Sequence, residues 1–117
     1  MLLVFQTPNV NATLTAEEGR RRYDVMMEYA DGLARRGVLT AGEALGSEAR
    51  SARLGKGTGS STVIDGPFIE AKEIIGGFLM LNVATRDETI DIAKTCPAVE
   101  WGTLEIREVG LCWDEFR

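Results

Sequence analysis

The sequence of 117 residues contains no histidine and only two cysteines. Without histidine, one chain cannot build a Ser-His-Asp triad or a Cys-His pair, so the common nucleophilic designs are excluded. The same absence removes the most common zinc ligand and the side chain that usually titrates near neutral pH. The carboxylates show no metal-ligand spacing either, so we expect no metal site.

Sequence features that mark secretion or membrane insertion are also missing. Cys96 and Cys112 are too few for a disulfide framework and lack CxxC spacing, so we expect two free thiols in a reducing cytoplasm. The strongest apolar run covers residues 74–81 and contains two glycines, far short of the ~20 residues that span a bilayer. The opening MLLVF lacks the basic segment of a signal peptide. We therefore expect a cytoplasmic protein that does not bind membranes.

Positive charge is scarce. The sequence has 13 Lys plus Arg against 18 Asp plus Glu, which gives a formal net charge of −5. Because contacts of basic side chains to phosphates drive nucleic-acid affinity, we expect no direct binding of nucleic acid. The basic cluster Arg20-Arg21-Arg22 lies beside Glu17 and Glu18 in a predicted helix. We expect this cluster to be a solvated helix face rather than a phosphate site.

Length and composition favour one soluble domain over residues 1–117, since a chain of this size can bury a core without disulfides. Thr15 and Thr85 each precede a glutamate by three residues, and these pairs begin two predicted helices as capping boxes. In each box we expect the threonine to accept from the glutamate amide while the glutamate side chain reaches back. Predicted strands cover residues 2–6, 51–54, 60–64, 77–84 and 103–109, with mainly irregular chain over 38–52 and a turn at 42–46.

The order of these elements predicts an α+β fold. When one short strand is omitted, the order corresponds to a split β-α-β repeat, the ferredoxin-like sandwich. Two helices then cover one face of an antiparallel sheet and leave the other face uncovered. Because small domains often cover such a face by pairing sheet to sheet, we expect a homodimer.

The glycine-rich segment GKGTGSS at residues 55–61 invites comparison with a phosphate-binding loop. That loop needs GxxxxGK[ST] between a strand and a helix. Here the lysine precedes the later glycines, and a strand follows instead of a helix whose N-terminus binds an anion. A hairpin turn is therefore favoured, and no cofactor is expected.

The most distinctive motif is DGPFIEAKE at residues 65–73. One interpretation is a structural corner, because Asp caps the amides that follow, Gly turns freely and Pro fixes φ. The other interpretation is a functional site. Asp65 ends a predicted strand, with Lys72 and Glu73 close behind, and carboxylates beside a lysine can form an acid–base or ligand-holding group when partly desolvated.

Residues 65–73 resemble the DGPF(A)ETKE signature of the YCII-related, or DGPF-domain, bacterial proteins. The resemblance extends over most of the chain. It includes the segments 37–39, 42–45 and 76–78, and it ends at the closing strand within 99–109. Ile69 and Ala71 depart from the signature, where the family usually has Ala and Thr.

The resemblance implies a ferredoxin-like fold that pairs into a dimeric α+β barrel. For the wider relatives, a His–Asp pair in a cleft at the dimer interface has been suggested, and a histidine-free chain cannot carry that pair. Matching positions make Asp65, Glu43 and Lys72 the candidate catalytic residues. Glu73 and Phe68 are the candidate binding residues.

Two functional hypotheses follow. In the first, a small homodimeric protein binds a small molecule in a cleft near Asp65, with Asp65 or Glu43 as the base of any reaction and Lys72 as its electrostatic partner. In the second, the chain is a non-catalytic regulatory or accessory module that acts through protein–protein contacts, because proteins with this signature are often associated with extracytoplasmic-function sigma factors. A purely structural dimer is a third interpretation. The first hypothesis predicts that the three candidate catalytic residues converge on one concave pocket.

Overall fold

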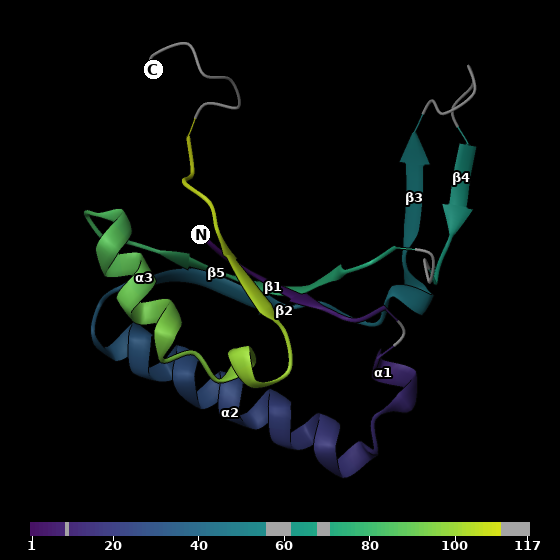
Figure 1. Cartoon of the computed structure of the whole chain (residues 1–117), viewed down its shortest axis with the longest axis horizontal. Helices are drawn as coiled ribbons and strands as arrows, with labels where there is room; N and C mark the ends of the chain where they lie inside the picture. The colour runs from purple at the N-terminus through teal and green to yellow at the C-terminus, as the bar shows by residue number, and fades with distance from the viewer. Residues whose placement is uncertain (9, 56–61, 68–70, 111–117) are drawn as a thin grey trace.

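The computed structural model describes residues 1–8, 10–55, 62–67 and 71–110. Figure 1 shows how the strands and helices are arranged. In chain order they are β1 (Leu2–Gln6), α1 (Val10–Thr13), α2 (Ala16–Arg35), β2 (Leu39–Ala44), the 3-10 turn η1 (Glu48–Arg50), β3 (Ala52–Gly55), β4 (Thr62–Asp65), β5 (Ile74–Leu81), α3 (Arg86–Lys94), the 3-10 turn η2 (Pro97–Glu100) and β6 (Thr103–Ile106).

A four-stranded antiparallel sheet with the order β2-β5-β1-β6 forms the centre of the molecule. Helices α2 and α3 lie on the same side of this sheet (Figure 1). The main core joins Leu2 and Leu79 of the sheet to Leu33 of α2 and to Ile92 and Ala93 of α3. This α+β arrangement is compatible with the ferredoxin-like fold expected from the order of elements.

The prediction of mainly irregular chain over 38–52 is wrong, because β2 lies there and pairs with β5. The sequence LTAGEA of β2 lacks the alternation and most of the β-branched residues typical of a strand. Gly42 allows a close approach to β5, since a Cβ on it would lie 2.8 Å from Leu79 Cδ2 and 3.1 Å from the Phe78 carbonyl oxygen, so that these neighbours would have to shift. The sequence predicted that one of the strands at 51–54 and 60–64 would belong to the main sheet. In the structure β2 occupies that position instead.

Both long helices begin where the capping boxes predict. The Thr15 hydroxyl oxygen accepts from the Glu18 amide at 3.1 Å, and the Thr85 hydroxyl oxygen accepts from the Glu88 amide at 3.2 Å. Just after α2, Gly37 adopts a φ of 75°, which suits a residue without a Cβ. Among the described residues, no helix has the length and apolar character needed to cross a membrane.

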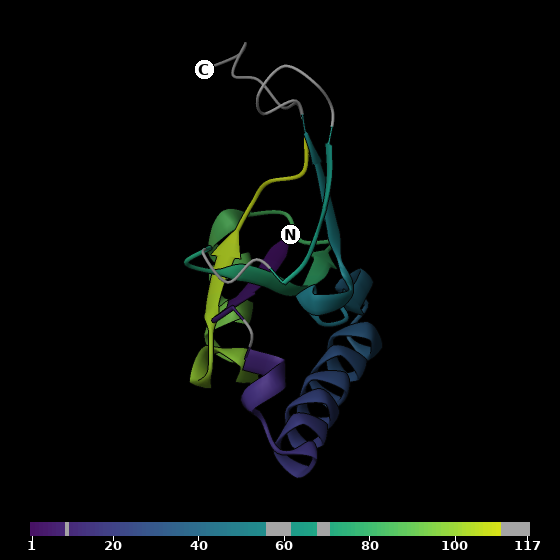
Figure 2. The same cartoon turned by 90° about the vertical axis from the view of Figure 1, so that its right-hand side faces the viewer.

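Strands β3 and β4 form a separate antiparallel hairpin, here called the arm, whose tip at 56–61 lies outside the described residues. The two strands predicted around 51–54 and 60–64 are thus present. Figures 1 and 2 show the arm projecting from one end of the four-stranded sheet, on the side away from α2. The Cα radius of gyration is 16.1 Å, against roughly 13 Å for a compact domain of similar length, as expected for a molecule with a projecting arm.

Candidate functional site

Helix α2 leaves a space between itself and the sheet along the turns that precede Leu33. Its buried residue is Leu33, near the C-terminal end, whereas Tyr23 and Met27 are 51% and 46% exposed. The space between this part of the helix, from Gly19 to Asp31, and the sheet is a cavity of ≈ 560 Å³, here called the helix–sheet cavity. This volume falls within the roughly 300–1,000 Å³ of known small-molecule sites.

Apolar side chains form much of the wall of the helix–sheet cavity, and a few polar groups interrupt them. Among the lining residues are Tyr23, Met26, Met27 and Ala30 of α2, Val4, Leu39 and Leu79 of the sheet, and Trp101 after η2. Gln6, Arg22 and Asp31 also line the cavity and contribute polar groups. An apolar hollow with a small number of polar groups is typical of a small-molecule site.

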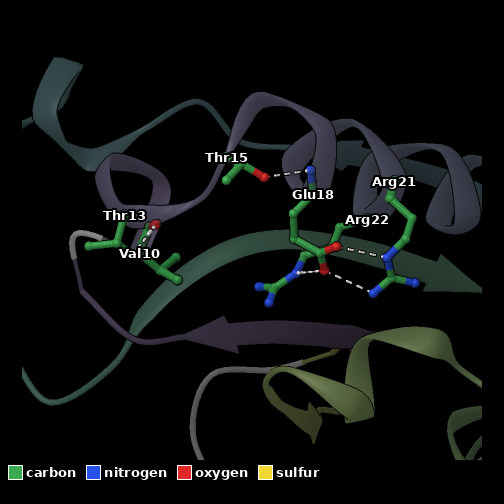
Figure 3. Close-up of polar contacts among 6 residues, drawn as sticks. All are labelled: Val10, Thr13, Thr15, Glu18, Arg21 and Arg22. Atoms are coloured by element: carbon green, nitrogen blue, oxygen red, sulfur yellow. Dashed lines mark hydrogen bonds and ion pairs between the residues drawn. The ribbon is translucent and has the colours of Figure 1, made fainter.

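Glu18, in the first turn of α2, positions two arginines (Figure 3). Its carboxylate accepts hydrogen bonds from Arg21 Nε and Nη2, both at 2.9 Å, and from Arg22 Nε at 3.0 Å. The guanidinium carbons of Arg21 and Arg22 lie 5.9 and 5.1 Å from the centroid of the Trp101 ring, within cation–π range. The hydrogen bonds from Arg21 and Arg22 lower the pKa of Glu18 from 4.5 to about 2.

This cluster corrects two expectations from the sequence. The Glu18 side chain binds Arg21 and Arg22 instead of reaching back to complete the capping box. Arg22 does not belong to a fully solvated face, because its side chain is only 23% exposed and lies over Trp101. The sequence offered no sign of this contact, since α2 meets Trp101 only through the folding of distant segments.

The turn at 65–67 fits closely against η1. The Gly66 amide donates to the Ser51 carbonyl at 2.8 Å, and a Cβ on Gly66 would lie 1.9 Å from the carbonyl oxygen of Glu48. Asp65 is exposed at the end of β4 and does not line the helix–sheet cavity. The close fit of Gly66 supports the structural-corner interpretation of this turn.

A second cavity, of ≈ 790 Å³, lies at the base of the arm and is here called the corner cavity. Its lining residues include Phe5, Leu45, Ser51, Ala52, Ile74 and Ile75. The end of the sheet, η1 and the first two residues of β3 therefore surround this one cavity.

The predicted site residues are spread over the molecule. Glu43 lines the helix–sheet cavity, although the alternation of β2 directs its side chain to the opposite face of the sheet. Glu73 lines the corner cavity, whereas Lys72 and Asp65 line neither of these two cavities. Phe68 lies outside the described residues. Neither cavity brings Asp65, Glu43 and Lys72 together.

Two further polar groups lie within the packing between helices and sheet. The Tyr29 hydroxyl donates to the Ile92 carbonyl at 2.5 Å and so ties α2 to α3, and burial raises the pKa of Tyr29. Cys96 is almost fully buried as a free thiol, and burial raises its pKa as well. Over the part of the chain that the structure describes, no group of three or more His, Cys, Asp or Glu residues could hold a metal ion.

The fold and the cavity define a small α+β protein with a hollow between a helix and an antiparallel sheet. The chain belongs to the YCII-related domain family, whose sequence model matches residues 1–112. It is 30% identical over 118 residues to an uncharacterized protein of Rhizobium meliloti (strain 1021), and the match covers 94% of this chain and 90% of that protein. The family expected from the motif at 65–73 is therefore confirmed.

Proposed function

We propose that this YCII-related protein binds a small, largely apolar molecule in the helix–sheet cavity. The proposal is carried by the exposure of Tyr23 and Met27 in a hollow of ≈ 560 Å³ between α2 and the sheet. Burying a large apolar side chain stabilises a protein by about 1.5–3 kcal/mol. A ligand that covers both side chains would therefore gain a substantial part of its affinity from removing their apolar surface from water.

Binding fits the geometry better than acid–base catalysis. A general base must lie within hydrogen-bond reach of the proton that it removes. Asp65 and Lys72 line neither cavity, and the β2 alternation turns the Glu43 carboxylate away from α2. Gln6 and Arg22 are better placed to orient a polar end of the ligand, because both line the helix–sheet cavity.

We also propose that the protein is a homodimer that pairs through the face of the sheet opposite α2. Leu2 and Leu79 point into the core under the helices. Alternation along β1 and β5 therefore turns Leu3, Phe78 and Met80 to the other face, where Leu3 lies opposite Phe78, although Phe78, like Glu43, is also among the residues that line the helix–sheet cavity. An apolar face of this kind is typical of an interface. A regulatory protein partner stays a prediction from the family resemblance.

Methionine methyl groups offer a direct test of ligand binding. Met26 and Met27 line the helix–sheet cavity, whereas Met80 lies on the opposite face of the sheet. We expect small apolar fragments, titrated into protein with isotope-labelled methionine methyl groups, to shift the NMR signals of Met26 and Met27 and to leave the Met80 signal in place.

Two variants sharpen this test. Met27→Trp fills the helix–sheet cavity and should abolish the ligand-induced shift of the Met26 signal. Asp65→Asn should leave fragment binding unchanged, because Asp65 does not line this cavity. Fragments that shift only the Met80 signal, or that bind equally well to Met27→Trp, would contradict the proposed site.

A further inference from the structure

The arm exposes apolar side chains on both of its faces. Leu54 and Val63 lie opposite each other and are 67% and 64% exposed, and Ile64, on the other face, is 58% exposed. Single exposed apolar residues are ordinary on protein surfaces, but a contiguous pair on a projecting element indicates an interaction site.

Within the described part of the chain, the two strands of the arm pack mainly on each other. Neither β3 nor β4 packs on another described element as extensively as on its hairpin partner. A two-stranded hairpin alone is at best marginally stable in water, and packing against a further layer is needed to stabilise it. We therefore expect a partner to cover one face of the arm.

We propose that the Leu54–Val63 face of the arm packs against the uncovered sheet face of a second copy of this chain. This inference rests on the homodimer put forward under the proposed function, and it makes the arm part of the dimer interface. The arm projects from the sheet on the side away from α2 (Figures 1 and 2), which is also the side of the uncovered sheet face, and the corner cavity lies at the base of the arm. Two such corners related by a twofold axis can each receive the arm of the other, which makes the contact self-complementary.

The size of the sheet face supports a contribution from the arm. Four strands about 4.8 Å apart, each about five residues long, cover roughly 19 by 17 Å, or about 320 Å². A stable interface buries about 800 Å² on each partner. Side chains that project from the sheet make its accessible surface larger than this flat area. Even so, the sheet face alone is too small for a stable dimer. The arm adds the exposed side chains of Leu54 and Val63 to the apolar surface available for such a contact.

The uncovered face also has the composition of an interface. One row across the sheet runs from Glu43 through Phe78 and Leu3 to Glu105. Its two central residues are apolar, and its two acidic residues lie on the edge strands β2 and β6. An apolar centre inside a charged rim is the usual pattern of a protein–protein interface.

Sedimentation of the full chain over a range of concentrations tests the proposal. We expect the double variant Leu54→Lys/Val63→Lys to weaken dimerisation at least tenfold relative to the wild type. Val99→Lys is the matched control, because Val99 is also an exposed valine but lies in η2, away from the arm. This control should change the dimer dissociation constant by less than twofold.

The outcomes separate the arm from the dimer itself. A wild-type protein that stays monomeric at all concentrations overturns both the homodimer and the role of the arm. A wild-type dimer that the double variant leaves equally tight overturns the role of the arm alone. A far-UV circular dichroism spectrum of the double variant checks that the fold is kept.

Cross-linking gives a second measurement that does not depend on weakening the dimer. Leu54→Cys in a Cys112→Ser background carries one accessible thiol, since Cys96 is buried. A photoreactive maleimide on that thiol, irradiated in a mixture of isotopically light and heavy protein, should yield light–heavy products joined at Met80 or Phe78. Products that join the arm only to its own chain would overturn the proposal.

Discussion

Gly66 is the residue at which the DGP turn depends most directly on the absence of a side chain. A Cβ there would lie 1.9 Å from the carbonyl oxygen of Glu48, so the backbone of η1 or of the turn must move. Overpacking of this kind costs typically 1–3 kcal/mol. We expect Gly66→Ala to lower the free energy of unfolding by about 3 kcal/mol, measured by guanidinium denaturation at one fixed protein concentration.

Gly32 in α2 is the matched control for this substitution. A Cβ on Gly32 meets nothing within 4 Å, and replacing a helical glycine by alanine stabilises a helix by about 1 kcal/mol. Gly32→Ala should therefore raise the free energy of unfolding while Gly66→Ala lowers it. A neutral Gly66→Ala would contradict the close fit of the turn against η1.

Cys96 provides a second prediction about one side chain. It is 1% exposed, and burial raises the pKa of its thiol. Because the thiolate is the reactive form, Cys96 should not react with Ellman's reagent at mildly alkaline pH in the native protein. The variant Cys112→Ser leaves Cys96 as the one thiol, so its reaction is read directly. Full reaction is expected once guanidinium unfolds the chain, whereas rapid reaction without denaturant would indicate local opening around η2.

Among the elements, α2 depends on pH through Glu18. The pKa of Glu18 is about 2 in the folded protein, lowered from 4.5 by hydrogen bonds from Arg21 and Arg22. A lowered pKa means that the carboxylate stabilises the fold above its ordinary pKa, and that this contribution is lost as the pH falls from about 4.5 toward about 2. We expect Glu18→Gln to be less stable than the wild type at neutral pH, with a gap that closes over this range.

Glu17 serves as the control, because it lies in the same first turn of α2 and shares the favourable end of the helix dipole. Glu17→Gln should show a smaller gap than Glu18→Gln in the same series of unfolding curves. Equal gaps for the two variants would mean that the dipole, rather than the bonds to Arg21 and Arg22, accounts for the effect of Glu18.

Elements with strong local signals could be predicted from the sequence, and those held by tertiary packing could not. The capping residues Thr15 and Thr85 fix where α2 and α3 begin, and both helices begin there. Strand β2 was missed because its weak strand propensity is overridden by pairing with β5, where Gly42 allows a close approach to Leu79. The order of the sheet therefore needed the structure, although the fold class did not.

The candidate site was harder to predict for the same reason. The motif at 65–73 is distinctive because its turn chemistry is local, and Gly66 fits there as a structural corner. The helix–sheet cavity has no local signature. It exists because α2 packs near Leu33 and stands off at Tyr23 and Met27, and because Trp101 comes from a distant segment to the same hollow.

At the scale of the whole molecule, the two faces of the sheet are expected to serve different purposes, and Met80 can report on one of them. It lies opposite Ala41 on the face away from α2, whereas Met26 lines the helix–sheet cavity. If that face is the dimer interface, diluting the wild-type protein from millimolar to low micromolar concentration should shift the methyl signal of Met80 and leave that of Met26 unchanged. The midpoint of the shift should agree with the dissociation constant from sedimentation, because both report one equilibrium.

In Leu54→Lys/Val63→Lys the midpoint should move to higher concentration, since the arm then contributes less to the contact. A Met80 signal that does not change with concentration, in a protein that sedimentation shows to be a dimer, would place the interface elsewhere and leave the sheet face open for another partner.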